Sequence, residues 1–224
     1  MKFQHHPVQG GVPPTHLWLM LPGAYMKAQD FIDAGFVTAL RQRGLPHEVA
    51  LLEATLVDVA DGSALAFLQE FLRSASAAGP ARVSLLGISL GAHLALACLA
   101  RADLDDQQAR AAARVHSACL LAPYLGPRDI VADVAGATRS GETDAAAPAP
   151  EDIDRRIWHW LQRRGPNDCP LHLGYGSEDR FAAAHALMAR SLPPERVQVL
   201  PGGHHWPVWS GLWNRYLDSN HVHA

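Results

Sequence analysis

The sequence contains few features that would cross-link the chain or place it in a membrane. Among its 224 residues are only three cysteines, Cys98, Cys119 and Cys169, with no C-x-x-C spacing. Scattered cysteines in odd number indicate free thiols in a reducing compartment rather than a disulfide framework. The first apolar run, residues 17–21, is far too short to span a membrane, and the residues before it lack the apolar core of a signal peptide. We therefore expect a cytoplasmic protein without a membrane span.

Strong charge of either sign is also missing. The formal net charge is −3, and no run of Lys or Arg forms a basic stripe, so nucleic acid is not an expected partner. Histidine is abundant, with 13 residues, but no H-x-x-x-H pair is placed on a helix, and adjacent histidines point in different directions. We expect neither a metal site nor a cofactor. The sequence gives no indication of the oligomeric state.

Short apolar runs alternate with segments of helical periodicity along the whole chain. Because this alternation is typical of a parallel sheet covered on both faces, we predict a three-layer α/β/α sandwich with a mostly parallel central sheet. The length suits one domain, residues 1–224, with an extended lead-in over 1–14. The expected strands are 17–21, 48–52, 83–86, 115–121, 171–175 and 197–200, and the expected helices are 28–43, 63–78, 90–100, 152–164, 181–191 and 206–217.

The composition changes between about residues 126 and 164. Residues 139–150 are small, polar and interrupted by proline, which predicts a mobile loop, and a helix follows. The segment is either a modest lid above the site described next or a plain surface insertion.

The most informative stretch is Gly87-Ile88-Ser89-Leu90-Gly91, a G-x-S-x-G between an apolar strand and a helix of small residues. In this context the pattern predicts a nucleophile elbow, a sharp turn that lifts the serine hydroxyl above the sheet. The same pentapeptide in isolation would be a glycine-rich turn with an incidental serine. The flanking strand and helix favour Ser89 as a nucleophile.

An activated serine needs a base, and the base needs a carboxylate that orients it. Asp179 follows the strand 171–175 and His204 follows the strand 197–200, so both are expected at the carboxyl edge of the sheet. Glu178, Asp129 and Asp133 are alternative acids, and His205 is an alternative base. The chain order Ser, Asp, His and the position of His204 directly after Gly202-Gly203 favour Asp179 and His204.

Taken together, these residues resemble the α/β-hydrolase superfamily, in its small single-domain serine esterase type. The resemblance covers about residues 17–217 and is carried by GISLG at 87–91, GSED at 176–179, GGHHW at 202–206 and LPGAY at 21–25. It implies that Ser89 attacks a carbonyl, that His204 transfers the proton, and that Asp179 orients His204.

The resemblance also implies an oxyanion hole of two backbone N–H groups. Leu90, directly after the nucleophile, supplies one, and Ala24 supplies the other, with Tyr25 as the alternative. Many relatives carry His-Gly where this chain has Pro22-Gly23, which leaves the subfamily open. The candidate pocket residues are Tyr25, Tyr124, His205 and Trp206.

The expected function is hydrolysis of a small or medium acyl ester through an acyl-enzyme. An acyl-thioesterase or acyltransferase would use the same triad, and its substrate would then be a thioester or a second acyl acceptor. A non-catalytic ligand-binding protein on the same scaffold is a third alternative, although such proteins usually lose a member of the triad.

Overall fold

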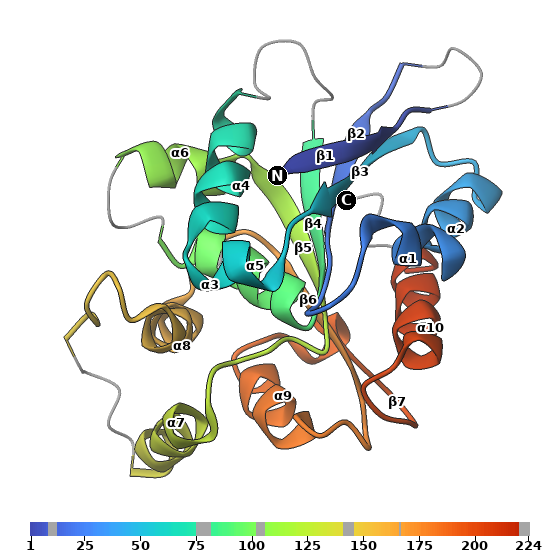
Figure 1. Ribbon diagram of the computed structural model, residues 1–224. Helices are drawn as coiled ribbons and strands as arrows, with labels where there is room; N and C mark the ends of the chain where they lie inside the picture. The colour runs from blue at the N-terminus through green and yellow to red at the C-terminus, as the bar shows by residue number, and fades with distance from the viewer. Residues whose placement is uncertain (9–12, 75–81, 102–105, 141–145, 166, 220–224) are drawn as a thin grey trace.

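The computed structural model of the chain describes residues 1–8, 13–74, 82–101, 106–140, 146–165 and 167–219. Its centre is a seven-stranded sheet in the order β1-β3-β2-β4-β5-β6-β7 (Figure 1). All neighbouring strands are parallel except β1, which runs antiparallel to β3 at one edge. The strands are β1 Lys2–His6, β2 His16–Leu21, β3 His47–Glu53, β4 Arg82–Ile88, β5 Val115–Leu121, β6 Leu171–Gly176 and β7 Val197–Leu200.

Helices cover both faces of this sheet, which confirms the predicted three-layer sandwich. One face is covered by α1 Ala28–Asp33, α2 Phe36–Gln42 and α10 Trp206–Leu217. The other carries α3 Leu56–Ala60, α4 Ser63–Ser74, α5 Leu90–Leu99, α6 Asp106–Ala113, α7 Arg128–Ser140, α8 Ile153–Arg163 and α9 Ala182–Ala189. A short 3-10 turn, Pro194–Arg196, precedes β7.

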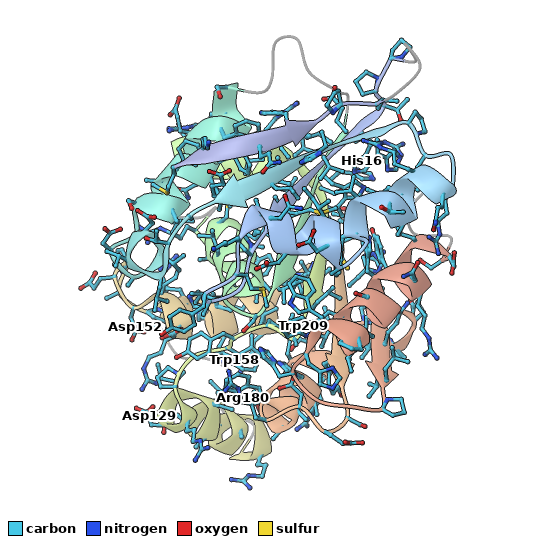
Figure 2. All side chains as sticks on the ribbon, turned by 45° about the vertical axis from the view of Figure 1, so that its right-hand side comes forward. His16, Asp129, Asp152, Trp158, Arg180 and Trp209 are labelled. Atoms are coloured by element: carbon cyan, nitrogen blue, oxygen red, sulfur yellow. The ribbon has the colours of Figure 1, made fainter. Side chains whose placement is uncertain are left out.

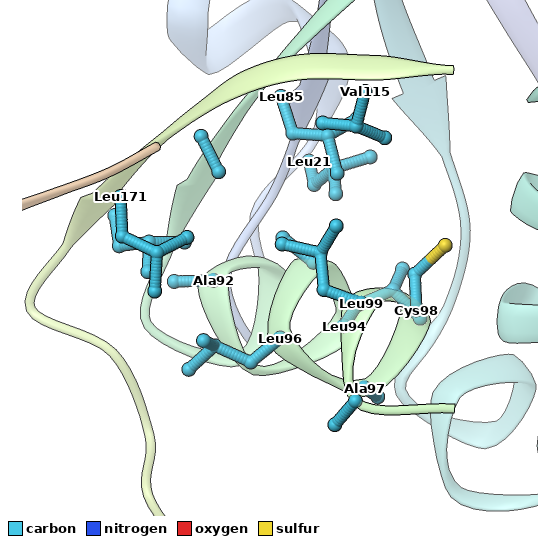
Figure 3. Close-up of a cluster of buried hydrophobic side chains, with 14 of the residues drawn as sticks. Leu21, Leu85, Ala92, Leu94, Leu96, Ala97, Cys98, Leu99, Val115 and Leu171 are labelled. Carbon is cyan, nitrogen blue, oxygen red and sulfur yellow. The ribbon is translucent and has the colours of Figure 1, made fainter. Parts of the chain in front are cut away.

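The central strand β4 and the helix α5 that follows it form the middle of the core. In β4, every residue after Arg82 is buried, as expected of a parallel strand covered on both faces. From Gly91 to Leu99 every residue of α5 is buried, so this helix has no solvent face. Figure 3 shows Leu94, Leu96 and Leu99 of α5 in one apolar cluster with Leu85 of β4. This packing fixes the start of α5 against the end of β4.

Two of the expected elements differ from the structure because of local backbone chemistry. The predicted helix 28–43 is two helices, since Gly35 adopts φ 79° between α1 and α2. The lead-in over residues 1–14 contains the unexpected strand β1, in which Lys2 and His5 are exposed and Phe3, Gln4 and His6 are partly buried. As an edge strand, β1 obtains its order from pairing with β3, from Lys2 opposite Glu53 to His6 opposite Val49.

Three further helices, α3, α6 and α7, lie where we expected no helix. The first of these, α3, spans Leu56–Ala60, and its start is capped by Thr55 accepting from the N–H of Asp58. Residues 128–140, predicted as the beginning of a lid segment, form α7. The predicted mobile loop over 139–150 falls partly on residues 141–145, outside the described part of the chain. The predicted helix at 152–164 is observed as α8.

Within the described residues, no helix is long and apolar enough to cross a membrane. The same part of the chain holds no group of three or more His, Cys, Asp or Glu side chains suited to a metal ion.

Candidate active site

Ser89 occupies a sharp turn at the junction of β4 and α5. Its backbone has φ 52° and ψ −110°, a conformation that a residue with a side chain rarely adopts. The two glycines of the motif allow this turn, because neighbouring backbone atoms lie too close to them for a side chain to fit. A Cβ on Gly87 would lie 2.4 Å from Cα of Ala92, and one on Gly91 would lie 2.0 Å from the carbonyl oxygen of Leu21. The spacing G-x-S-x-G therefore reflects two places where no side chain fits.

His204 contacts both of the other sequence-predicted residues. Its Nε2 lies 3.0 Å from Oγ of Ser89, and its Nδ1 lies 2.7 Å from Oδ2 of Asp179. The three residues come from the ends of different elements: the β4–α5 turn, the segment after β6 and the segment after β7. Their alignment is the geometry that proton transfer from the serine hydroxyl through the imidazole requires.

The second carboxylate oxygen of Asp179 is also bonded, because Oδ1 accepts the backbone N–H of Phe181 at 2.8 Å. Burial by itself would raise the pKa of Asp179, whose residue is only 5% exposed. Hydrogen bonds from His204 and from Phe181 N–H outweigh that effect and hold the pKa below its usual value. The carboxylate is therefore ionised while it faces the imidazole.

The alternative acids and the alternative base do not occupy these positions. Glu178 and Asp129 are exposed, and Asp133 is exposed and pairs with Arg155 at 3.0 Å. Figure 2 places Asp129 on α7, at the lower edge of the view. His205 is exposed at the start of α10, where its Nε2 accepts the N–H of Gly203 at 3.3 Å.

Two aromatic rings that we did not single out hold the His204 imidazole edge-on. The ring of Phe181 lies 5.5 Å from that of His204, and the ring of Trp209 lies 5.0 Å from it. In the sequence, Trp209 is simply an apolar residue of the expected helix 206–217, so no signal marks its contact with His204. In Figure 2, Trp209 and Arg180 lie toward the lower end of the sheet, whereas His16, at the start of β2, lies near the upper end. The site is therefore at the carboxyl edge, where we expected it.

The residues expected to form an oxyanion hole line one cavity. Ala24 and Leu90 both border a hollow of about 280 Å³ beside the start of α5. The Leu90 N–H belongs to the first turn of α5 and so has no partner within the helix. The loop after β2 is held against this turn, since Gly91 abuts the carbonyl groups of Leu21 and Pro22.

The four candidate pocket residues have different surroundings. Tyr25 lines the cavity with φ 62° and is 88% exposed. Tyr124 is half-buried, and its N–H donates to the carbonyl oxygen of Ser89 at 3.0 Å. Trp206 instead packs on the core, with ring distances of 5.8 Å to both Phe31 and Phe36. Thus Tyr124 contacts Ser89 and Tyr25 borders the cavity beside Leu90, whereas Trp206 and His205 face elsewhere.

A polar pair near the site, the buried His93 and the half-buried Asp154, had no signal in the sequence. His93, one helical turn after Ser89, has Nδ1 3.8 Å from Oδ1 of Asp154 on α8. Burial is the main influence on both groups, lowering the pKa of His93 and raising that of Asp154. The ring of His93 also lies 5.5 Å from that of Tyr124. The pair connects α8 to the helix that carries the candidate nucleophile.

Neither a protein-family model nor a curated protein matches this chain in sequence. Solved structures do match over nearly its whole length. An S-formylglutathione hydrolase (FrmB) from Staphylococcus aureus superposes with a TM-score of 0.61 at 13% identity, over 92% of this chain and 80% of its own.

Two further matches have similar architecture. The butyrate-bound esterase Est2 from Thermogutta terrifontis has a TM-score of 0.64 at 15% identity, over 96% of this chain and 87% of its own. The substrate-bound fluorophosphonate-binding serine hydrolase F (FphF) of Staphylococcus aureus has a TM-score of 0.57 at 12% identity, over 94% and 85% respectively. With its parallel sheet, its strand–turn–helix at Ser89 and these structural likenesses, the chain has the α/β-hydrolase fold.

Proposed function

We propose that this protein is a serine hydrolase that cleaves small or medium acyl esters through an acyl-enzyme. The observation that carries the proposal is the double hydrogen bonding of His204, to Ser89 Oγ at 3.0 Å and to Asp179 Oδ2 at 2.7 Å. Structural likeness to proteins described as esterases and serine hydrolases supports it, because those proteins share the fold.

In the acylation step, Ser89 Oγ attacks the ester carbonyl carbon while His204 Nε2 accepts the hydroxyl proton. Asp179 keeps Nδ1 protonated and stabilises the resulting imidazolium. The carbonyl oxygen becomes an oxyanion, which receives hydrogen bonds from the N–H groups of Leu90 and Ala24. His204 then donates its proton to the leaving alcohol as the C–O bond breaks, and the acyl group remains on Ser89.

In the second step, water replaces the alcohol. His204 takes a proton from the water as it attacks the acyl carbon, then returns a proton to Ser89 Oγ as the carboxylic acid leaves. The backbone of Ser89 keeps its strained conformation through both steps, so the nucleophile does not have to rearrange between them.

The first experiment is labelling by a fluorophosphonate probe, which phosphonylates only an activated serine. Wild type should be labelled, Ser89→Ala should not, and Ser74→Ala should be labelled like wild type. Ser74 is a suitable matched control because it is exposed at the end of α4 and its hydroxyl donates to the carbonyl of Phe71. Loss of ester hydrolysis in Ser89→Ala, with unchanged circular dichroism, completes the test.

A folded wild type that is neither labelled nor active on esters would reject the proposal. Equal labelling of wild type and Ser89→Ala would assign the reactivity to another residue and reject it as well.

A further inference from the structure

The cavity beside Leu90 has a shape and lining that suit one part of an ester substrate. It measures about 280 Å³ and is bounded by the loop after β2, the segment from the end of β3 through α3, and the first turns of α5. Its wall includes the aliphatic side chains of Leu52, Leu56, Val59 and Leu94. A hollow with this lining binds an apolar chain.

Its position relative to His204 decides which part of the ester it would hold. The leaving oxygen must lie within hydrogen-bond reach of His204 Nε2, because that nitrogen protonates it. None of the described residues that line the cavity comes from β6, α9 or the segment carrying His204. By contrast, Ala24 and Leu90, the proposed donors to the carbonyl oxygen, both line it. A substituent in the cavity therefore extends from the carbonyl on the side away from the leaving group.

We propose that this cavity is the acyl pocket and that it favours straight-chain aliphatic acyl groups over acetyl, with the preference rising until the chain fills the cavity. A methylene takes up about as much space as a water molecule, whose share of liquid volume is about 30 Å³, so a cavity of about 280 Å³ accepts roughly eight or nine carbons. This assignment rests on the proposed function, since it presupposes acyl transfer to Ser89.

Longer chains have an exit from this pocket. A second hollow of about 610 Å³ lies along β1, β3 and α1, and it shares with the first the residues Met26, Lys27, Leu52, Ala54 and Thr55. Because these residues border both hollows, we expect an acyl chain that outgrows the first hollow to extend toward the second. We expect the preference for acyl length to level off beyond about eight carbons rather than to fall sharply.

The test compares two series of esters on the intact chain. In the first, p-nitrophenyl esters carry acyl groups of increasing length, from acetyl through octanoyl to dodecanoyl. In the second, acetate esters carry alcohols of increasing length. The first series should show kcat/KM rising about fourfold per methylene up to octanoyl, which corresponds to ~0.8 kcal/mol per buried CH₂. The second series should be nearly flat.

A pair of variants on the same short helix locates the effect. Val59 lines the cavity from α3, whereas Val57, 69% exposed on the same helix, does not line it. Val59→Trp should fill the pocket and lower the octanoyl-to-acetyl ratio of kcat/KM at least tenfold. Val57→Trp should leave the ratio unchanged. If Val59→Trp fails to fold, Leu56→Trp, at a residue that is 41% exposed, tests the same wall.

The outcomes separate this inference from the proposed function. A rise along the alcohol series with a flat acyl series would overturn the acyl assignment and leave esterase activity intact. Acetate hydrolysis with no length dependence in either series, or equal effects of Val57→Trp and Val59→Trp, would also overturn it. Absence of all ester hydrolysis together with absence of fluorophosphonate labelling would overturn both proposals.

Discussion

Asp179 Oδ2 lies 2.7 Å from His204 Nδ1, while its other oxygen accepts the backbone N–H of Phe181 at 2.8 Å. The carboxylate is thus fixed by the turn that follows β6, and the imidazole is fixed by the carboxylate. In the proposed mechanism, this relationship makes Asp179 the residue that selects the His204 tautomer whose Nε2 can accept a proton.

Replacing Asp179 by Asn should lower kcat by up to about 10⁴-fold, because an amide NH₂ opposite Nδ1 favours the wrong tautomer of His204. Steady-state hydrolysis of a p-nitrophenyl ester measures the loss. The matched control is Glu178→Gln, which alters an exposed neighbouring carboxylate and should change kcat less than twofold. A loss below tenfold in Asp179→Asn, or a larger one in Glu178→Gln, would contradict the assignment.

The activity should rise with pH between acidic and neutral conditions. Only a neutral His204 imidazole can accept the Ser89 proton, and the lowered pKa of Asp179 keeps that carboxylate ionised throughout this range. For a single ester, kcat/KM should therefore fall on the acidic side of the profile as one group becomes protonated. A flat profile, or activity that increases toward acid, would be inconsistent with His204 as the base.

Gly91→Ala should destabilise the fold strongly, by about 3 kcal/mol, since the added Cβ would lie 2.0 Å from the Leu21 carbonyl oxygen and force β2 and α5 apart. Gly136→Ala provides the control. Gly136 lies within α7, where an added Cβ meets no atom within 4 Å, and the better helix propensity of alanine should stabilise by up to about 1 kcal/mol. Urea unfolding measures both, and similar midpoints for the two variants would refute the close-packing argument.

The stability of the protein should fall as the pH drops below neutrality, and His16 should account for a measurable part. His16 is buried, with Nε2 2.8 Å from Oγ of Ser84. Burial, and then the positive charges that His47, His116 and Arg82 can carry, lower the pKa of His16 to about 3. The unfolded chain binds the proton near the ordinary pKa of about 6.5, so between these values it holds more protons than the folded chain and is favoured as the pH falls.

Urea unfolding at pH 7 and pH 5 tests this linkage. His16→Gln removes the titrating group. Between pH 7 and pH 5, the unfolding free energy of this variant should therefore fall by about 2 kcal/mol less than that of wild type. His5→Gln, at an exposed histidine, should lose stability in parallel with wild type. Identical slopes for wild type and His16→Gln would show that His16 binds its proton equally in both states.

The sequence alone determined the alternation of strands and helices, because buried parallel strands and their covering helices need apolar runs of characteristic length and period. It also determined the elbow at Ser89, since the G-x-S-x-G spacing and its flanking segments are local. The last helix, expected over 206–217, begins and ends at those residues. In each of these cases, the information lies within a few neighbouring residues.

Only the tertiary structure decided the features that depend on contacts between residues far apart in the sequence. The strand β1 is ordered because β3 offers it an edge, and the cap at Thr55 starts α3 where we expected no helix. Asp179 and Glu178 are adjacent in sequence, and only the placement of the turn after β6 directs one toward His204 and leaves the other in solvent. The cavity beside Leu90 likewise combines three segments far apart in the chain. Sequence patterns record local periodicity, whereas the direction of one side chain and the volume between elements are set by how the packed elements meet.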